Sequence, residues 1–81
     1  MARVLFLGSQ RRYTGGEAET QVDAADFRTL ATELLRRYPG FPAAELERCT
    51  VAIDGEIVSS PFLEPLGAQT EVRFLHRLAA G

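Results

Sequence analysis

The stretch TVAIDGEIV, residues 50–58, decides the fold of this 81-residue chain. Two short apolar runs flank the dipeptide Asp54–Gly55. A two-residue type I′ turn prefers such a pair, because both of its central residues must adopt positive φ angles. The stretch therefore predicts a β-hairpin, with one strand on each side of the turn.

Residues 71–78, EVRFLHRL, indicate a further strand on the C-terminal side of the hairpin. Apolar and polar side chains alternate from Glu71 to Arg77, as they do in a strand with one buried face. The connecting segment, residues 59–70, is rich in turn-forming residues and is expected to bridge the hairpin to this last strand.

Two more strands are predicted before the hairpin, over residues 3–8 (RVLFLG) and 18–22 (AETQV). Both are short, with apolar side chains and turn-forming neighbours. The polar segment between them ends in Gly15–Gly16, which favours a tight turn. We therefore expect the two strands to pair in antiparallel fashion.

Residues 23–38 carry the one clear helical pattern in the chain. Asp23 is expected to cap the first turn, and Asp26, three residues later, to complete a capping-box-like arrangement. Pro39–Gly40 ends the helix, and one further helical turn is expected after Pro42. Apolar side chains recur at helical spacing and should form the buried stripe: Phe27, Leu30, Ala31, Leu34 and Tyr38.

The order strand, strand, helix, strand, strand, strand predicts an α+β fold, in which a mixed sheet of four to five strands packs on one helix. The crossover rule makes the first and last strands parallel neighbours in the middle of the sheet. This arrangement is the β-grasp, or ubiquitin-like, fold. Since 81 residues are too few for two cores, we expect residues 1–81 to form one domain with a short flexible C-terminal tail, residues 78–81.

The composition argues against several function classes. Nine basic residues against eleven acidic ones give a net charge of -2, whereas nucleic-acid binding requires a concentrated positive surface. No apolar run approaches the ~20 residues of a membrane span, and residues 1–10 lack the features of a signal peptide. We therefore expect a cytoplasmic protein that binds neither nucleic acid nor membrane.

The alternation in the strands assigns side chains to two faces of the sheet. The side chains expected to cover the helix are Val4, Phe6, Val51, Ile53, Val72 and Phe74. The opposite side, which we term the outer face, carries a leucine cluster with a rim of arginines: Leu5, Leu7 and Leu75 with Arg3, Arg73 and Arg77. Two or three leucines on an open sheet face are ordinary, but such a cluster is also suited to docking an acidic partner, with the arginines steering it.

The side chains offer no credible catalytic site. His76 is the one histidine in the sequence, so no His-rich metal site can form, and no cofactor is expected. A dyad of Cys49 and His76 is conceivable because both lie near strand ends. The favoured interpretation is a buried cysteine that acts as a small hydrophobe and a histidine at the rim of the core.

The chain resembles the MoaD/ThiS family, the ubiquitin-like sulfur carriers of molybdopterin synthase and thiamine biosynthesis. The resemblance runs in order from VLFLGSQRRYTGG through FRTLATELLRRYP and VAIDGEIV to EPLGAQTEVRFL and a terminus of small residues. It implies that an E1-like adenylating enzyme activates the carboxylate of Gly81 with ATP. Sulfur then replaces the activated oxygen, and the resulting thiocarboxylate delivers it in molybdopterin or thiamine-type cofactor biosynthesis.

The resemblance also implies roles for the rest of the tail. Ala79 and Ala80 would thread a narrow channel in the partner, where only small residues fit, and a larger synthase subunit is a further expected partner. The chain itself would be a carrier or small subunit with no catalytic site of its own. The family ends in Gly-Gly, whereas Ala80 precedes Gly81 here. The alternative is therefore a non-catalytic ubiquitin-like interaction subunit whose tail is not activated.

Overall fold

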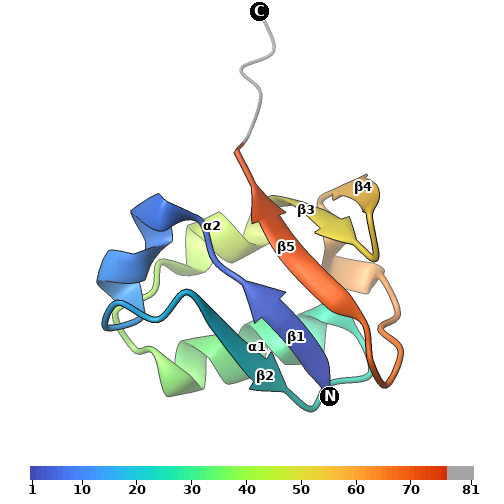
Figure 1. Cartoon of the computed structure of the whole chain (residues 1–81), viewed down its shortest axis with the longest axis horizontal. Helices are drawn as coiled ribbons and strands as arrows, with labels where there is room; N and C mark the ends of the chain where they lie inside the picture. Colours follow the sequence, from blue (N-terminus) through green and yellow to red (C-terminus); the bar gives the residue numbers. More distant parts are fainter. Residues whose placement is uncertain (77–81) are drawn as a thin grey trace, which may run out of the picture.

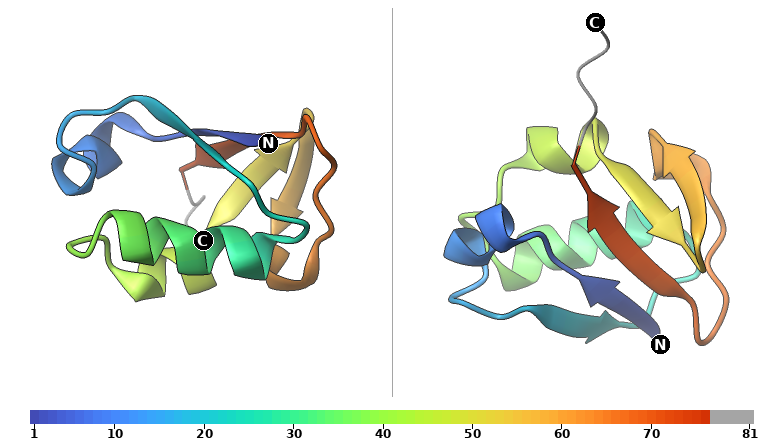
Figure 2. Two further views of the ribbon diagram at one scale, coloured as in Figure 1. Left: turned by 90° about the horizontal axis from the view of Figure 1, so that it is seen from below. Right: turned by 45° about the horizontal axis from the view of Figure 1, so that its top comes forward.

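The structure, a computed structural model, describes residues 1–76; residues 77–81 lie outside the described part of the chain. Within residues 1–76, five strands form one sheet, and the longer helix lies across one of its faces (Figures 1 and 2). The strands are β1 (Ala2–Leu5), β2 (Glu19–Val22), β3 (Thr50–Ile53), β4 (Glu56–Ser59) and β5 (Glu71–Leu75). The helices are α1 (Phe27–Arg37) and α2 (Ala43–Glu47), with the 3-10 turns η1 (Gly8–Tyr13) and η2 (Pro61–Leu63).

The sheet has the mixed topology that the sequence predicts. Its strand order is β2-β1-β5-β3-β4. The central strands β1 and β5 run parallel, with Val4 opposite Val72, and the other neighbouring strands are antiparallel. The predicted β-grasp fold is thus confirmed (Figure 1).

The hairpin at Asp54–Gly55 is confirmed in its turn geometry. The φ angles are 49° at Asp54 and 85° at Gly55, both positive, as a type I′ turn requires. The turn is also tied to β5: the Asp54 N–H donates to the Glu71 carbonyl at 2.9 Å, and the Glu71 N–H donates to Asp54 Oδ1 at 2.8 Å. The hairpin therefore fixes the position of β5 as well as its own two strands.

The core lies between the sheet and α1, as expected. The largest fully buried side chains include Phe27, Leu30 and Leu34 of α1. They face an inner sheet surface made of Val4, Val22, Val51, Val72 and Phe74, all at most 2% exposed. An aromatic group extends this core beyond the strands, with Phe6 packed edge-to-face on Tyr38 and stacked on Phe74.

Helix α1 begins three residues later than the sequence suggests, so the prediction of Asp23 as its cap is wrong. Asp26 is the N-cap, and its Oδ1 accepts from the Thr29 N–H at 2.8 Å. The reason is a contact from far along the chain. The Phe27 N–H donates to the Glu64 carbonyl and the Ala25 carbonyl accepts from the Leu66 N–H. These bonds hold Asp26 in an extended conformation opposite Pro65, so the helix cannot begin before Phe27.

The first strand is also shorter than predicted, because the chain turns after Phe6. The Leu7 N–H donates to Gln10 Oε1 and the Gln10 N–H donates to the Leu7 carbonyl, both at 2.9 Å. These bonds start η1 where the alternation had indicated strand as far as Gly8. The expected tight turn follows η1, with positive φ at both Gly15 and Gly16.

Candidate functional site

The outer face of the sheet carries the leucines that the sequence places there, with one exception. Leu5 pairs with Arg73 across β1 and β5, so Leu75 lies on the same face, one step further along β5. Both leucines are half-buried, and no described helix covers this face. Figure 2 shows α1 on the opposite side of the sheet.

Leu7 departs from that prediction. It follows the end of β1 and packs against the core at the end of the sheet. The strand alternation that assigned it to the outer face stops at Leu5. The apolar part of the outer face therefore contains two of the three predicted leucines.

Ile57 is an outer-face residue that the sequence reasoning missed. It lies opposite Ala52 in the hairpin, and Ala52 lies opposite Arg73, so all three share a face. Ile57 is 70% exposed. The signal was present in the sequence, because a two-residue turn at Asp54–Gly55 fixes the register and leaves Ile57 outward once Val51 and Ile53 face the core.

The arginines of the outer face are paired with carboxylates of the same face. Arg3 Nε lies 2.5 Å from Glu19 Oε2, and a side-chain hydrogen bond and charge attraction to Arg3 lower the pKa of Glu19. The second carboxylate, Glu71, lies 3.9 Å from both Arg3 and Arg73. These four side chains therefore sum to no net charge. The prediction that Arg3, Arg73 and Arg77 steer an acidic partner stays a prediction.

The residues predicted to act in docking, channel threading and activation come after β5 in the sequence. Strand β5 ends at Leu75, and His76 is exposed. Arg77, Ala79, Ala80 and Gly81 lie outside the described residues. Their roles in docking, channel threading and activation stay predictions.

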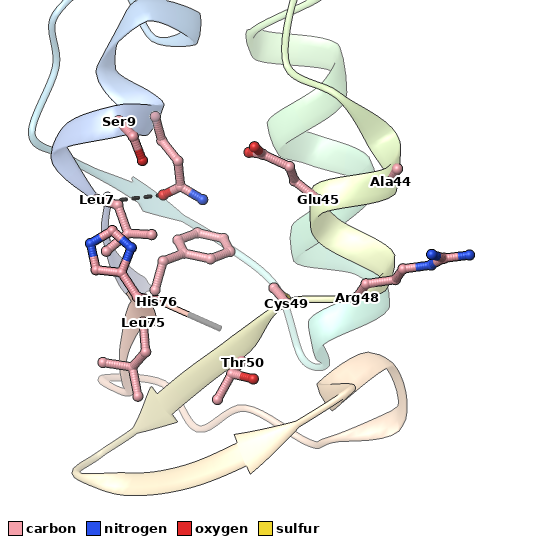
Figure 3. Close-up of a pocket in the computed structure, with 11 residues that line it drawn as sticks. Leu7, Ser9, Ala44, Glu45, Arg48, Cys49, Thr50, Leu75 and His76 are labelled. Carbon is pink, nitrogen blue, oxygen red and sulfur yellow. Dashed lines mark hydrogen bonds between the residues drawn. The ribbon is translucent and has the colours of Figure 1, made fainter. Parts of the chain in front are cut away.

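A cavity of about 350 Å³ lies beside this end of β5. Figure 3 shows it between η1 and the end of β5 on one side and α2 on the other. Its apolar wall includes Leu7, Phe74 and Leu75, and its polar lining includes Glu45 and Cys49. No local sequence pattern indicates this cavity, because its lining comes from segments distant along the chain.

Cys49 lines the cavity but is not an activated nucleophile. Burial raises the pKa of its thiol to about 11, and its Sγ donates to the Leu46 carbonyl at 3.4 Å. A reactive cysteine requires the opposite shift, because the thiolate is the nucleophile. Cys49 packs against the core, as the favoured interpretation of the sequence holds, and the structure gives no support for a dyad with His76.

Neither a membrane segment nor a metal cluster is found in the part of the chain that the structure describes. No helix within residues 1–76 has the length and apolar character needed to cross a bilayer. The same residues hold no group of three or more side chains of the kinds that bind metal ions.

Comparison with known proteins gives structural matches alone. No family model matches the sequence, and no curated protein sequence matches it significantly. Among solved structures, CysO of Mycobacterium tuberculosis, described as an antigen, superposes with a TM-score of 0.80 at 14% identity, over 96% of this chain and 100% of CysO.

Two further structures match over nearly their whole length. SAMP1 of Haloferax volcanii has a TM-score of 0.69 at 16% identity, with 99% of this chain and 98% of SAMP1 covered. A Pyrococcus furiosus protein described as a "Putative molybdopterin converting factor, subunit 1" has a TM-score of 0.64 at 19% identity, with 95% and 97% covered. The likeness that the sequence suggests is thus confirmed for the fold: this chain has the β-grasp architecture of CysO, SAMP1 and the Pyrococcus subunit.

Proposed function

We propose that this protein is a sulfur carrier of the MoaD/ThiS type, which acts in the cytoplasm in molybdopterin or thiamine-type cofactor biosynthesis. The observation that carries the proposal is the whole-length structural match with a protein named as a molybdopterin converting factor subunit. The order of sequence segments that resembles the family supports the same assignment. The reacting group in this proposal is the carboxylate of Gly81.

The chemistry takes place on the tail and needs no catalytic side chain from the domain. An E1-like adenylating enzyme would bring the Gly81 carboxylate to the α-phosphate of ATP, with release of pyrophosphate. Hydrosulfide from a sulfide donor would then attack the acyl carbon of the adenylate and displace AMP, which leaves a thiocarboxylate. Ala79 and Ala80 would extend through the enzyme's channel, where their small side chains meet the least steric resistance.

The outer face would supply the docking surface for this enzyme and for a larger synthase subunit. Leu5, Leu75 and Ile57 offer apolar area near the strand from which the tail continues. Since Arg3 and Arg73 are balanced by carboxylates on the same face, burial of apolar surface would contribute more to binding than net charge. Arg77, outside the described residues, would add a further contact.

Mass spectrometry of the intact protein tests the activation step. The purified protein is first shown to end at Gly81, and is then incubated with the adenylating enzyme, ATP and a sulfide donor. The expected result is a gain in mass equal to the exchange of one oxygen for one sulfur. A variant with one alanine added after Gly81 is the matched control for position, because it should still bind but presents a displaced carboxylate. Alanine is used because an added glycine would recreate the family's Gly-Gly ending.

A second variant, Ala80→Gly, examines the departure from the family's Gly-Gly ending. It removes one methyl group from the threading segment, so activation should be as fast as in the native protein or faster. If the native terminus is never modified, and the alanine-extended protein replaces the native one in a deletion strain, the carrier proposal is refuted.

The second candidate function is a non-catalytic interaction subunit that uses the outer face alone. The exposed Ile57, which lies on the same face as Leu5 and Leu75, favours it, because a docking face is useful without tail chemistry. The two candidates differ in one result. The interaction subunit keeps its function when Gly81 is extended, and the sulfur carrier loses it.

A further inference from the structure

The Glu45 side chain faces the cavity beside the end of β5. Its Oε2 is buried and accepts no hydrogen bond from any group within residues 1–76. Among residues 1–76, no basic side chain forms an ion pair with Glu45. Figure 3 shows Glu45 pointing from α2 toward η1, while Arg48, one turn later, points away from it.

The described residues around Glu45 provide no hydrogen-bond donor to its buried Oε2. A shielded carboxylate oxygen without a donor lowers stability compared with one that is bonded. The last torsion of a glutamate side chain is broad, so a small rotation can turn either oxygen toward the cavity. A cationic donor in the cavity would supply the missing interaction.

The rest of the cavity is suited to an aliphatic stem rather than to a compact ion. Leu7, Phe74 and Leu75 supply apolar wall, and the hydroxyls of Ser9 and Thr50 lie among the lining residues. The volume of about 350 Å³ is within the range of small-ligand pockets. An arginine or lysine side chain fits both the apolar wall and the Glu45 carboxylate, because it buries an aliphatic stem and carries a charged head.

We propose that this cavity receives one arginine or lysine side chain of a protein that docks at this end of the sheet. The stem packs against Leu7 and Leu75, and the charged head bonds to Glu45. Leu75 lines the cavity and also belongs to the outer face. A protein docked on the outer face at Leu75 would therefore lie next to the cavity. The inference does not depend on activation of Gly81.

The test is a titration of the full-length protein followed by NMR of its backbone amides. The probes are butylguanidinium, its uncharged analogue butylurea, and acetyl-Gly-Arg-Gly-amide, which presents arginine as a protein does. The two arginine-like probes should shift the amide signals of Ser9, Glu45 and Thr50, with dissociation constants on the order of millimolar for ligands of this size. Butylurea should shift them far less.

Two isosteric variants of α2 decide whether Glu45 is responsible. Glu45→Gln keeps the shape and removes the charge. It should weaken butylguanidinium and the peptide by about tenfold or more, the loss expected for a charge-assisted hydrogen bond. Glu47→Gln, on the same helix but exposed and outside the cavity lining, should leave the affinity unchanged.

Four outcomes would overturn the proposal. Equal shifts from butylurea and butylguanidinium would show an apolar cavity without charge selectivity. Unchanged affinity in Glu45→Gln would place the cation elsewhere. Binding of butylguanidinium with rejection of the peptide would indicate a small-molecule site. Binding that appears only after Arg77→Ala would show that the chain's own arginine occupies the cavity.

Discussion

Phe74 gives the sharpest test of how the sheet holds together. It lies on β5, is 2% exposed, and faces Val51 across the pairing with β3. Its ring stacks on Phe6 with centroids 6.0 Å apart, and Phe41 lies at 6.4 Å. Truncation to alanine would remove the packing of this side chain against Phe6, Phe41 and its cross-strand neighbour Val51. It would also enlarge a cavity that Phe74 already lines.

The expected loss for Phe74→Ala is about 3–5 kcal/mol, the usual range for deleting a buried aromatic ring. At about 0.05–0.15 kcal/mol per residue, the whole domain has roughly 4–12 kcal/mol of stability. With a urea m-value of about 1 kcal/mol per molar, the midpoint of unfolding should fall by about 3 M or more. The measurement is equilibrium unfolding in urea, followed by far-ultraviolet circular dichroism.

Two companion variants keep the measurement interpretable. Phe74→Leu retains most of the apolar carbons, so it should lose less than Phe74→Ala and remain folded if the alanine variant does not. Ile57→Ala removes a side chain that is 70% exposed on the same sheet and should change stability by less than about 0.5 kcal/mol. A loss below about 1 kcal/mol for Phe74→Ala would contradict the assignment of β5 to the core.

Three other perturbations address the docking face, the thiol and the helix cap. Leu75→Glu should weaken binding to the adenylating enzyme by about tenfold or more in isothermal titration calorimetry. Leu63→Glu, at an 86% exposed position on η2, should leave binding unchanged, and equal binding by both variants would refute docking through the outer face. Alkylation of Cys49 by iodoacetamide should be slow at neutral pH and should rise steadily with the thiolate fraction until the pH reaches about 11, whereas rapid neutral-pH labelling would contradict its burial. Hydrogen bonds from the Thr29 side chain and backbone lower the pKa of Asp26 below 3.8, so its ionised form stabilises the fold above that value and this contribution disappears as the pH falls through the lower folded-state pKa. Thermal unfolding should therefore show that Asp26→Asn loses less stability in acid than the native protein does. Parallel plots of stability against pH for the two proteins would disprove the assignment of Asp26 as the helix N-cap.

Sequence alone predicted the elements whose causes are local. The turn at Asp54–Gly55 follows from two residues that tolerate positive φ, and the strands on either side follow from alternation. The inward set of Val4, Val72 and Phe74 was assigned from the same period of two. In each case the deciding residues are neighbours in the chain, so no knowledge of the rest of the fold was needed.

The errors arose where a distant segment decides the outcome. Asp23 and Asp26 are equally good caps by residue type, and the choice was made by backbone hydrogen bonds to Glu64 and Leu66. The side chain of Gln10 ended β1 early by accepting from the Leu7 N–H. The position of Glu45 beside the end of β5 depends on the packing of η1, α2 and β5 together, which no local pattern encodes.

The parallel pairing of β1 with β5 determines when, during its synthesis, the protein can fold. The ribosome delivers β1 first and β5 last of the five strands, so the two central strands meet only after Leu75 has been added. Until then β1 and β3 each keep one edge with unpaired backbone groups, which is a template for pairing with other chains. Closure of the sheet is a late and non-local step, of the kind that limits folding rates. A chain that terminates before β5 would therefore lack the centre of its sheet, and it should be bound by chaperones or degraded rather than persist as a partly working protein.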